Sequence, residues 1–189
     1  HRDRALRVRQ GERDLAEQST FEETGYLLLY GELPKASELA AFDAELKRAR
    51  ALPGPVLDII ASLKTAHPMD VLRTTVSALA AFDPQTSDNS RAATIAKGIR
   101  LTAQVPMIVA AHERIRTGKA PLAADPTLSH AANVLWMLKG AKPSADAADL
   151  LDTDLVLHAG RHAGVHVLIV IDRGELGELR RLEADGAEA

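Results

Sequence analysis

The sequence predicts an all-α fold, and three observations lead to this prediction. Alanine, leucine and arginine are the most frequent of the 189 residues, and all three favour helices, as do glutamate and lysine. Apolar side chains recur every three or four residues, which places them on one face of a helix. Glycines and prolines separate these segments at short intervals. A multi-helical protein with short connections is therefore expected.

The first helix is expected over residues 21–30. Ser19 followed by Glu22 is a capping-box pattern, in which a hydroxyl and a carboxylate accept hydrogen bonds from backbone N–H groups at a helix start. Gly31 follows the segment, and glycine is the preferred residue just past the end of a helix because it adopts positive φ angles.

The second helix is expected to open at Pro34 and Ser37 and to close near Pro53, because Leu39 and Leu46 repeat on one face. Pro106 should kink or split the longest helix, since proline lacks a backbone N–H. Further helices are expected from Pro55 through Leu63, from Pro68 through Leu79, from Arg91 to Thr117, from Ser129 to Leu138 and from Ala145 to His158.

The pattern changes after His158. Gly160 and Gly164 interrupt the helical periodicity, and residues 165–171 are rich in β-branched side chains, which indicates a short buried strand. One strand in an otherwise helical chain has no partner to pair with, so this local signal disagrees with the rest of the sequence. Residues 175–189 are expected to be a charged helical or frayed tail.

Composition excludes several classes of protein. The chain has no cysteine, which rules out disulfides, thiol nucleophiles and cysteine-ligated metals. A net charge of −3 gives no general attraction to nucleic acid or to anionic membranes. No apolar run reaches the ~18 residues of a membrane span, and no signal peptide is recognisable. A cytoplasmic protein is expected, and the start at His1 suggests a piece of a longer chain.

Basic residues lie along the long helical segment, interleaved with alanine, isoleucine and valine. This arrangement favours a solvated helix face, whereas a nucleic-acid groove would combine clustered positive charge with aromatic side chains. No nucleic-acid partner is therefore expected. The residues concerned are Arg91, Lys97, Arg100, Arg114, Arg116 and Lys119.

Two groups of histidines invite a chemical interpretation. His158, His162 and His166 stand four apart, and on a continuous helix they could bind zinc, but the intervening glycines favour incidental histidines. His67 and Asp70 could form an acid–base pair within one turn. Because a proline and an acidic residue are both favoured in the first turn, helix capping is the preferred interpretation of that pair.

Several stretches together resemble the citrate synthase family in its shorter bacterial form, which includes 2-methylcitrate synthases. The most specific is H-P-M-D-V-L-R-T at residues 67–74. In family order there are also D-L-A-E at 14–17, S-T-F-E-E at 19–23, Y-L-L-L-Y-G-E-L-P at 26–34, P-M-I-V-A-A-H at 106–112, L-S-H-A-A-N at 128–133 and L-V-L-H-A at 155–159. The resemblance covers residues 14–159.

This resemblance implies an all-α, multi-helical large-domain portion of a two-domain homodimer. The family condenses acetyl-CoA or propionyl-CoA with oxaloacetate, in the tricarboxylic acid or methylcitrate cycle, and needs no metal or cofactor because the acyl-CoA is a substrate. One histidine polarises the thioester carbonyl, an aspartate removes a proton, and electrostatic stabilisation of the enol lowers the barrier.

The departures from the family concern its chemistry. No segment resembles its G-P-L-H-G-G-A motif, so no catalytic residue is carried over. Its H-A-D-H pattern is matched by His158 and Ala159, but Gly160 and Arg161 follow, and the substrate-binding histidine would be His162 only after a slip of one residue.

These departures divide the chain into a degraded segment over 1–13, a family-like portion over 14–159 and a non-family tail over 160–189. A truncated or frameshifted gene is expected, and the chain alone is expected to be inactive. The alternative is a non-catalytic helical remnant or an interaction module. Both acetyl-CoA and propionyl-CoA stay open as the acyl donor.

Overall fold

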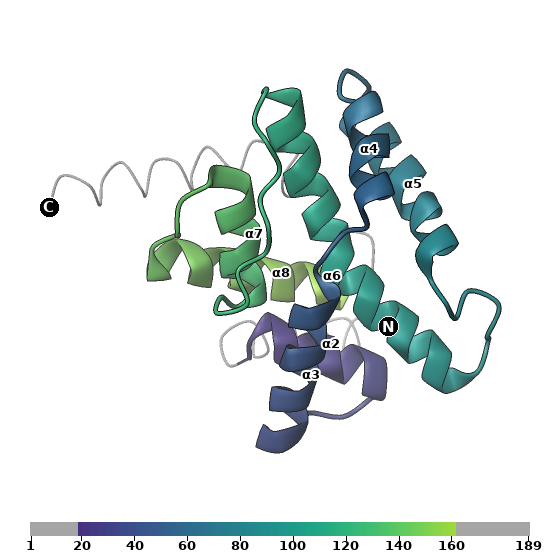
Figure 1. The fold of residues 1–189 in the computed structure, drawn as a ribbon. Coiled ribbons are helices and arrows are strands. Elements are labelled where there is room, and N and C mark those ends of the chain that lie inside the picture. Colours follow the sequence, from purple (N-terminus) through teal and green to yellow (C-terminus); the bar gives the residue numbers. More distant parts are fainter. Residues whose placement is uncertain (1–18, 162–189) are drawn as a thin grey trace, which may run out of the picture. The chain divides into compact units, whose positions relative to one another are not determined.

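The computed structural model describes residues 19–161, with side chains described through residue 157. Every regular element in these residues is helical, which confirms the all-α prediction (Figure 1). The elements are α2 (Phe21–Tyr30), α3 (Ala36–Ala49), α4 (Gly54–Ser62), α5 (Pro68–Leu79), the 3₁₀ turn η1 (Ala80–Phe82), α6 (Arg91–Arg116), α7 (His130–Lys139) and α8 (Ala145–Arg161). The strand expected over residues 165–171 lies outside the described residues.

None of the helices within residues 19–161 combines the length and the apolar character needed to cross a bilayer.

The cap of α2 lies one residue later than predicted. Thr20 is the N-cap: its hydroxyl accepts the N–H of Glu23 at 3.3 Å, and the Glu23 carboxylate accepts the N–H of Thr20 at 2.8 Å. Glu22, predicted to take that role, instead accepts the backbone N–H of His130 at 2.8 Å. The long-range bond therefore occupies the carboxylate that the local pattern assigned to the cap. Gly31 ends the helix at φ 90°, as predicted.

Two helix boundaries differ from the sequence expectation. Helix α3 begins at Ala36, because the N–H of Lys35 donates to the Glu38 carboxylate at 2.8 Å, and it ends at Ala49 rather than near Pro53. Residues before a proline disfavour the helical conformation, which is consistent with the earlier end. Helix α8 continues to Arg161, three residues past the predicted end at His158, so Gly160 does not interrupt it.

Helix α6 is a single helix of 26 residues that contains Pro106, so of the two predicted effects of this proline, a kink or a split, the split is wrong. Pro106 and its neighbours Met107 and Ile108 are buried, and both α4 and α5 pack on α6. Tertiary packing offsets the hydrogen bond that proline removes from the helix.

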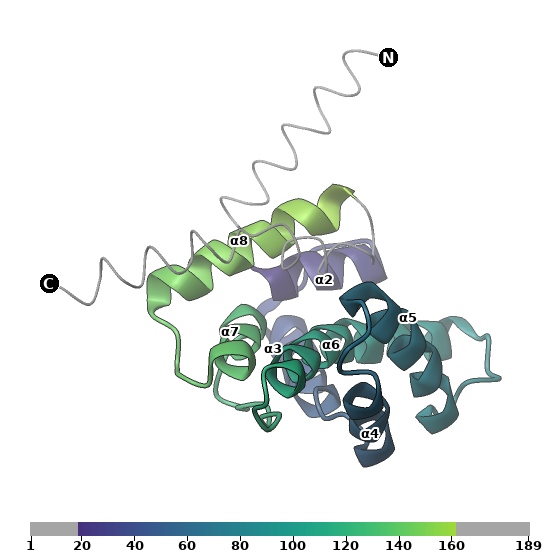
Figure 2. The same cartoon turned by 90° about the horizontal axis from the view of Figure 1, so that it is seen from above.

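The described residues fall into two compact units. The first contains residues 19–42, 130–132 and 143–161. Here α8 lies along α2 (Figure 2), and the Phe21 ring stacks on the His130 ring with centroids 4.5 Å apart. The N–H of Phe21 donates to the Asp152 carboxylate at 3.1 Å. A carboxylate 131 positions away in sequence thus accepts a hydrogen bond from one N–H of the first turn of α2.

The second unit contains residues 43–129 and 133–142, with α6 at its centre. Arg50 is 2% exposed, and its guanidinium donates to the carbonyl oxygens of Asp125 at 3.3 Å and Leu128 at 3.0 Å. The Asn133 side chain accepts the N–H of Asp125 at 2.8 Å. These bonds fix the segment before α7, because buried carbonyl and N–H groups require partners.

Replacing Arg50 by methionine should destabilise the fold. Methionine keeps much of the apolar stem but removes both bonds to the loop carbonyls, so we expect a loss of about 1–3 kcal/mol in the free energy of unfolding. Urea denaturation followed by circular dichroism measures this loss. Arg48→Met, at an exposed position in the last turn of α3, is the matched control and should change stability by less than about 0.5 kcal/mol. Equal losses in the two variants would contradict the role of Arg50.

Alanine at position 31 should be costly for a conformational reason alone. A Cβ at Gly31 or at Gly54 would meet no atom within 4 Å, but only Gly31 has a positive φ, of 90°. We expect Gly31→Ala to cost about 1 kcal/mol, because side chains other than glycine are strained there. Gly54→Ala should be neutral or stabilising in the same denaturation assay, and a loss of the same size there would refute this explanation.

Candidate functional site

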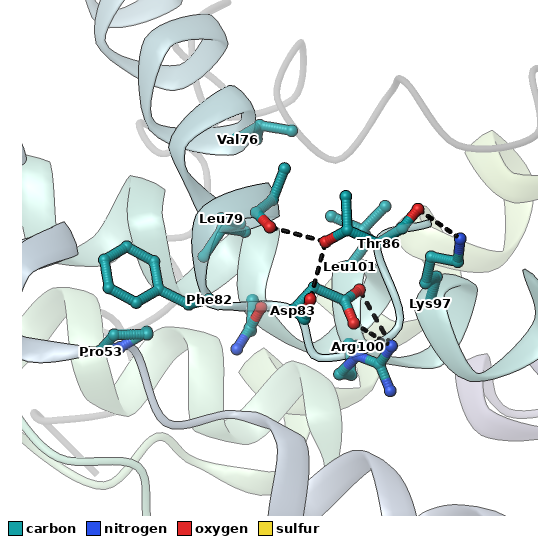
Figure 3. A pocket seen from close by; sticks show the side chains of 11 residues that line it. Pro53, Val76, Leu79, Phe82, Asp83, Thr86, Lys97, Arg100 and Leu101 are labelled. Carbon is teal, nitrogen blue, oxygen red and sulfur yellow. Dashed lines mark hydrogen bonds and ion pairs between the residues drawn. The ribbon is translucent and has the colours of Figure 1, made fainter. Parts of the chain in front are cut away.

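A hollow of about 220 Å³ lies in the second unit between α5, η1 and α6 (Figure 3). One wall is apolar and is formed by Pro53, Val76, Leu79, Phe82 and Leu101. Phe82 and Leu101 are 43% and 40% exposed, which is unusual for large apolar side chains. The hollow therefore offers an apolar surface that an apolar group of a ligand or of another chain could cover.

The polar floor of the hollow is an ion pair between Asp83, just after η1, and Arg100 on α6. Nη2 of Arg100 donates to both carboxylate oxygens of Asp83, at 2.8 and 2.9 Å, and the Gln85 side chain accepts from the same guanidinium at 3.2 Å. Figure 3 shows the guanidinium directed at the carboxylate. The N–H of Gln85 and the Arg100 guanidinium both lower the pKa of Asp83.

The loop between η1 and α6 is held by a second set of contacts. The Thr86 hydroxyl donates to the carbonyl oxygens of Ala80 and Asp83, at 2.7 Å each. Lys97 Nζ donates to the carbonyl oxygens of Asp88 at 2.6 Å and Thr86 at 3.3 Å. The positive charges of α6 thus bind its preceding loop.

These contacts correct part of the expectation that the basic residues form a solvated face. Arg91, Arg116 and Lys119 are exposed as predicted. Lys97 and Arg100 are partly buried and bind the loop, and Arg114 Nε donates to the Ala120 carbonyl at 2.6 Å. The physical reason is that short polar loops leave backbone carbonyls near the helix, and long basic side chains reach them. The spacing of the basic residues in the sequence does not indicate which of them bind loop carbonyls.

The hollow has the properties of a binding surface rather than of a reaction centre. A general base works best with a pKa near the working pH, whereas Asp83 has a lowered pKa and is paired with Arg100. The Arg100 guanidinium is likewise bound to Asp83 and Gln85. The hollow therefore combines an apolar wall with an ion pair whose two charges neutralise each other.

The structure confirms the capping interpretation of the H-P-M-D segment. His67 is the N-cap of α5, and its Nδ1 accepts the N–H of Met69 at 3.2 Å. Asp70 lies in the first turn and pairs with Arg73 one turn later. The imidazole and the carboxylate thus have separate structural partners.

The remaining histidine predictions stay untested. His158 belongs to α8, whereas His162, the predicted substrate-binding residue, and His166 lie outside the described residues. Among the side chains that the structure describes, no group of three or more potential ligands is placed to hold a metal ion.

Four polar residues have buried or long-range roles that the sequence did not predict, and one of them, Glu22, had been assigned to a local cap. Glu22 and Asp152 each accept a backbone N–H from another helix, and Arg50 and Asn133 bind the backbone of the segment before α7. Their partners lie between 8 and 131 positions away. Residue spacing within one helix carries no signal for such bonds.

The stretches that resemble a known family fall on the described helices. The segment 67–74 supplies the cap and first turns of α5, 106–112 the buried part of α6, and 128–133 the start of α7. The pattern over 155–159 ends in α8.

Comparison with known proteins gives a consistent result. The family described as "Citrate synthase, C-terminal domain" matches residues 11–162. The citrate synthase of Deinococcus radiodurans is 47% identical over 145 residues, which are 76% of this chain and 38% of that protein. The citrate/2-methylcitrate synthase of Bacillus subtilis is 37% identical over 147 residues, covering 77% of this chain and 40% of its own length.

The fold agrees with the sequence match. The crystal structure of citrate synthase from Pyrobaculum aerophilum superimposes with a TM-score of 0.76 at 33% identity, covering 78% of this chain and 39% of that one. The chain spans about two fifths of the length of the curated relatives it matches. With a family match across residues 11–162 and the same helical fold, this chain belongs to the citrate synthase family.

Proposed function

We propose that this chain is a large-domain portion of a citrate synthase-type enzyme, which condenses an acyl-CoA with oxaloacetate to give citrate or 2-methylcitrate and free CoA. The observation that carries the proposal is the family match over residues 11–162, which includes every described helix. The relatives comprise both citrate synthases and 2-methylcitrate synthases, so the acyl donor is acetyl-CoA or propionyl-CoA. The reaction uses no metal or separate cofactor, and the protein acts in the cytoplasm.

In this proposal, the chain does not perform the reaction alone. Its sequence contains no G-P-L-H-G-G-A segment, and Gly160 and Arg161 follow His158 and Ala159 where an Asp and a His are expected. Of the acidic groups described above, Asp83 is paired with Arg100 and Asp70 with Arg73. Enolisation needs a positioned base beside an electrophile, and these paired carboxylates do not supply one.

The chain incubated with acetyl-CoA, or propionyl-CoA, and oxaloacetate should release no CoA above background. A thiol reagent detects free CoA cleanly in this case, because the chain has no cysteine of its own. The intact Deinococcus radiodurans citrate synthase is the positive control. Release of CoA that rises with the concentration of this chain would overturn the proposed inactivity.

A complementation experiment tests the family role directly. The chain is co-expressed with the part of the Deinococcus radiodurans enzyme that it does not match, and we expect the two to copurify and to release CoA. That part expressed without the chain is the control and should be inactive. Two soluble pieces that neither copurify nor release CoA would contradict a competent large-domain portion.

A non-catalytic interaction module is the second candidate function, and one observation favours it. Phe82 and Leu101 expose apolar surface at the hollow between α5 and α6, where an associating chain would remove it from water. The partner in this case is a second copy of the chain, in line with the homodimer that the family resemblance implies. An interaction module does not require the catalytic segments that this sequence lacks.

The chain should therefore self-associate, and the double variant Phe82→Ser, Leu101→Ser should shift it toward the monomer. Sedimentation velocity over a range of concentrations measures the shift. Leu33→Ser is the matched control, because Leu33 is 59% exposed but lies outside this hollow. A wild-type chain that sediments as a monomer at all concentrations would refute the self-association, and an equal effect of Leu33→Ser would place the contact elsewhere.

A further inference from the structure

Helix α8 lies along α2 within the first unit (Figure 2). Asp152 of α8 contacts the first turn of α2 through the N–H of Phe21. The carboxylate is half-buried and accepts the N–H of Phe21 at 3.1 Å. The first N–H groups of a helix have no partner within the helix, so an acceptor from another element can replace the usual local cap. Asp152 thus bonds α8 to the start of α2.

Among the residues that the structure describes, the charged groups that act on Asp152 are acidic. Helix α2 contributes Glu22 and Glu23 from its first turn, and α8 contributes Asp149. Glu22 is 7% exposed and accepts the N–H of His130 from α7, whose ring stacks on Phe21. The start of α2 therefore already holds two carboxylates before Asp152 is added.

Ionisation of Asp152 in this position is unfavourable. Burial and the neighbouring Glu22 raise the pKa of Asp152 to about 6, although the Phe21 N–H acts in the opposite direction. A helix N-terminus favours negative charge, but Glu22 and Glu23 already provide it at the same turn. A third carboxylate gains little from the helix dipole and is repelled by the other two.

We propose that Asp152 is a proton-controlled cap, which holds α8 on α2 more firmly when its carboxyl group is protonated than when it is ionised. The proton sits on the oxygen that does not accept the Phe21 N–H, so the bond to α2 is kept in both states. Protonation of Asp152 therefore changes only the negative charge at the contact between α2 and α8. This inference concerns α2 and α8 alone and does not depend on the proposed function.

The sign of the pH dependence follows from the raised pKa. Between the ordinary pKa of 3.8 and the folded value of about 6, the folded chain binds more protons than the unfolded chain. The stability contributed by protonated Asp152 is fully present at low pH and is lost as the pH rises through 6. Acidification from pH 7.5 to pH 5 should therefore tighten the contact.

Asp152→Asn tests this proposal, because asparagine keeps an acceptor for Phe21 but cannot ionise. Thermal unfolding of the full chain, followed by circular dichroism, is compared at pH 5.0, 6.0 and 7.5. We expect the variant to melt roughly 3–6 °C above the wild type at pH 7.5 and about half as far above it at pH 5.0, because the stability is lost over the whole range from pH 3.8 to 6. Asp146→Asn, at an exposed position in the first turn of α8, is the matched control and should keep the pH dependence of the wild type.

Comparison of variants also separates Asp152 from His130, because histidines ordinarily titrate in the same pH range and His130 is present in every chain tested. Parallel curves for the wild type and Asp152→Asn would overturn the proposal, as would a variant that is less stable at pH 7.5. Should Asp152→Asn fail to fold, the side-chain carboxyl carbon of Asp152 is followed by NMR in the wild type. A titration midpoint near 6 supports the proposal, and a midpoint near 3.8 overturns it.

Discussion

The structure depends on one constraint: backbone groups left open at helix ends and in loops must find partners when they are buried. In the first unit, a backbone N–H at the start of two helices donates to a carboxylate that is distant in sequence. Asp152 is the acceptor for α2, and Glu22 is the acceptor for α7. These bonds span 131 and 108 positions of sequence. They bring two carboxylates and the Phe21 and His130 rings into one contact, so the acidic crowding at α2 is a direct consequence of how its end is closed.

The same constraint determines what the second unit can do. Arg50 donates to two loop carbonyls, Lys97 to two more, and Arg100 holds Asp83 at the start of the loop before α6. Charges that could have bound a ligand are thus occupied in fixing the backbone. The hollow between α5 and α6 consequently presents an apolar wall and a neutralised floor, which suits association better than proton transfer.

Local signals in the sequence predicted local structure well. Gly31 ends its helix at a positive φ, and His67 caps α5 as its position before proline suggested. Prediction was wrong where a distant partner competed with the local pattern. Glu22 does not take part in the capping box, because its carboxylate accepts the N–H of His130 instead. Arg50 led to no prediction, because its carbonyl partners lie 75 or more positions away. The candidate substrate residue His162 lies outside the described residues, so that prediction is untested.

Structural caps and reactive groups make opposite demands on a carboxylate. A cap requires an acceptor in a fixed place and is strongest when neighbouring donors hold it ionised, as Gln85 and Arg100 do for Asp83. A reactive group requires a proton that can move near neutral pH, which burial among like charges provides. Asp152 combines the position of a cap with the electrostatics of a reactive group. The repulsion among the carboxylates is offset by the burial of apolar side chains on the same two helices, Phe21 on α2 and Leu151 and Leu155 on α8. Hydrophobic burial thus allows a helix contact to hold a titratable carboxyl group.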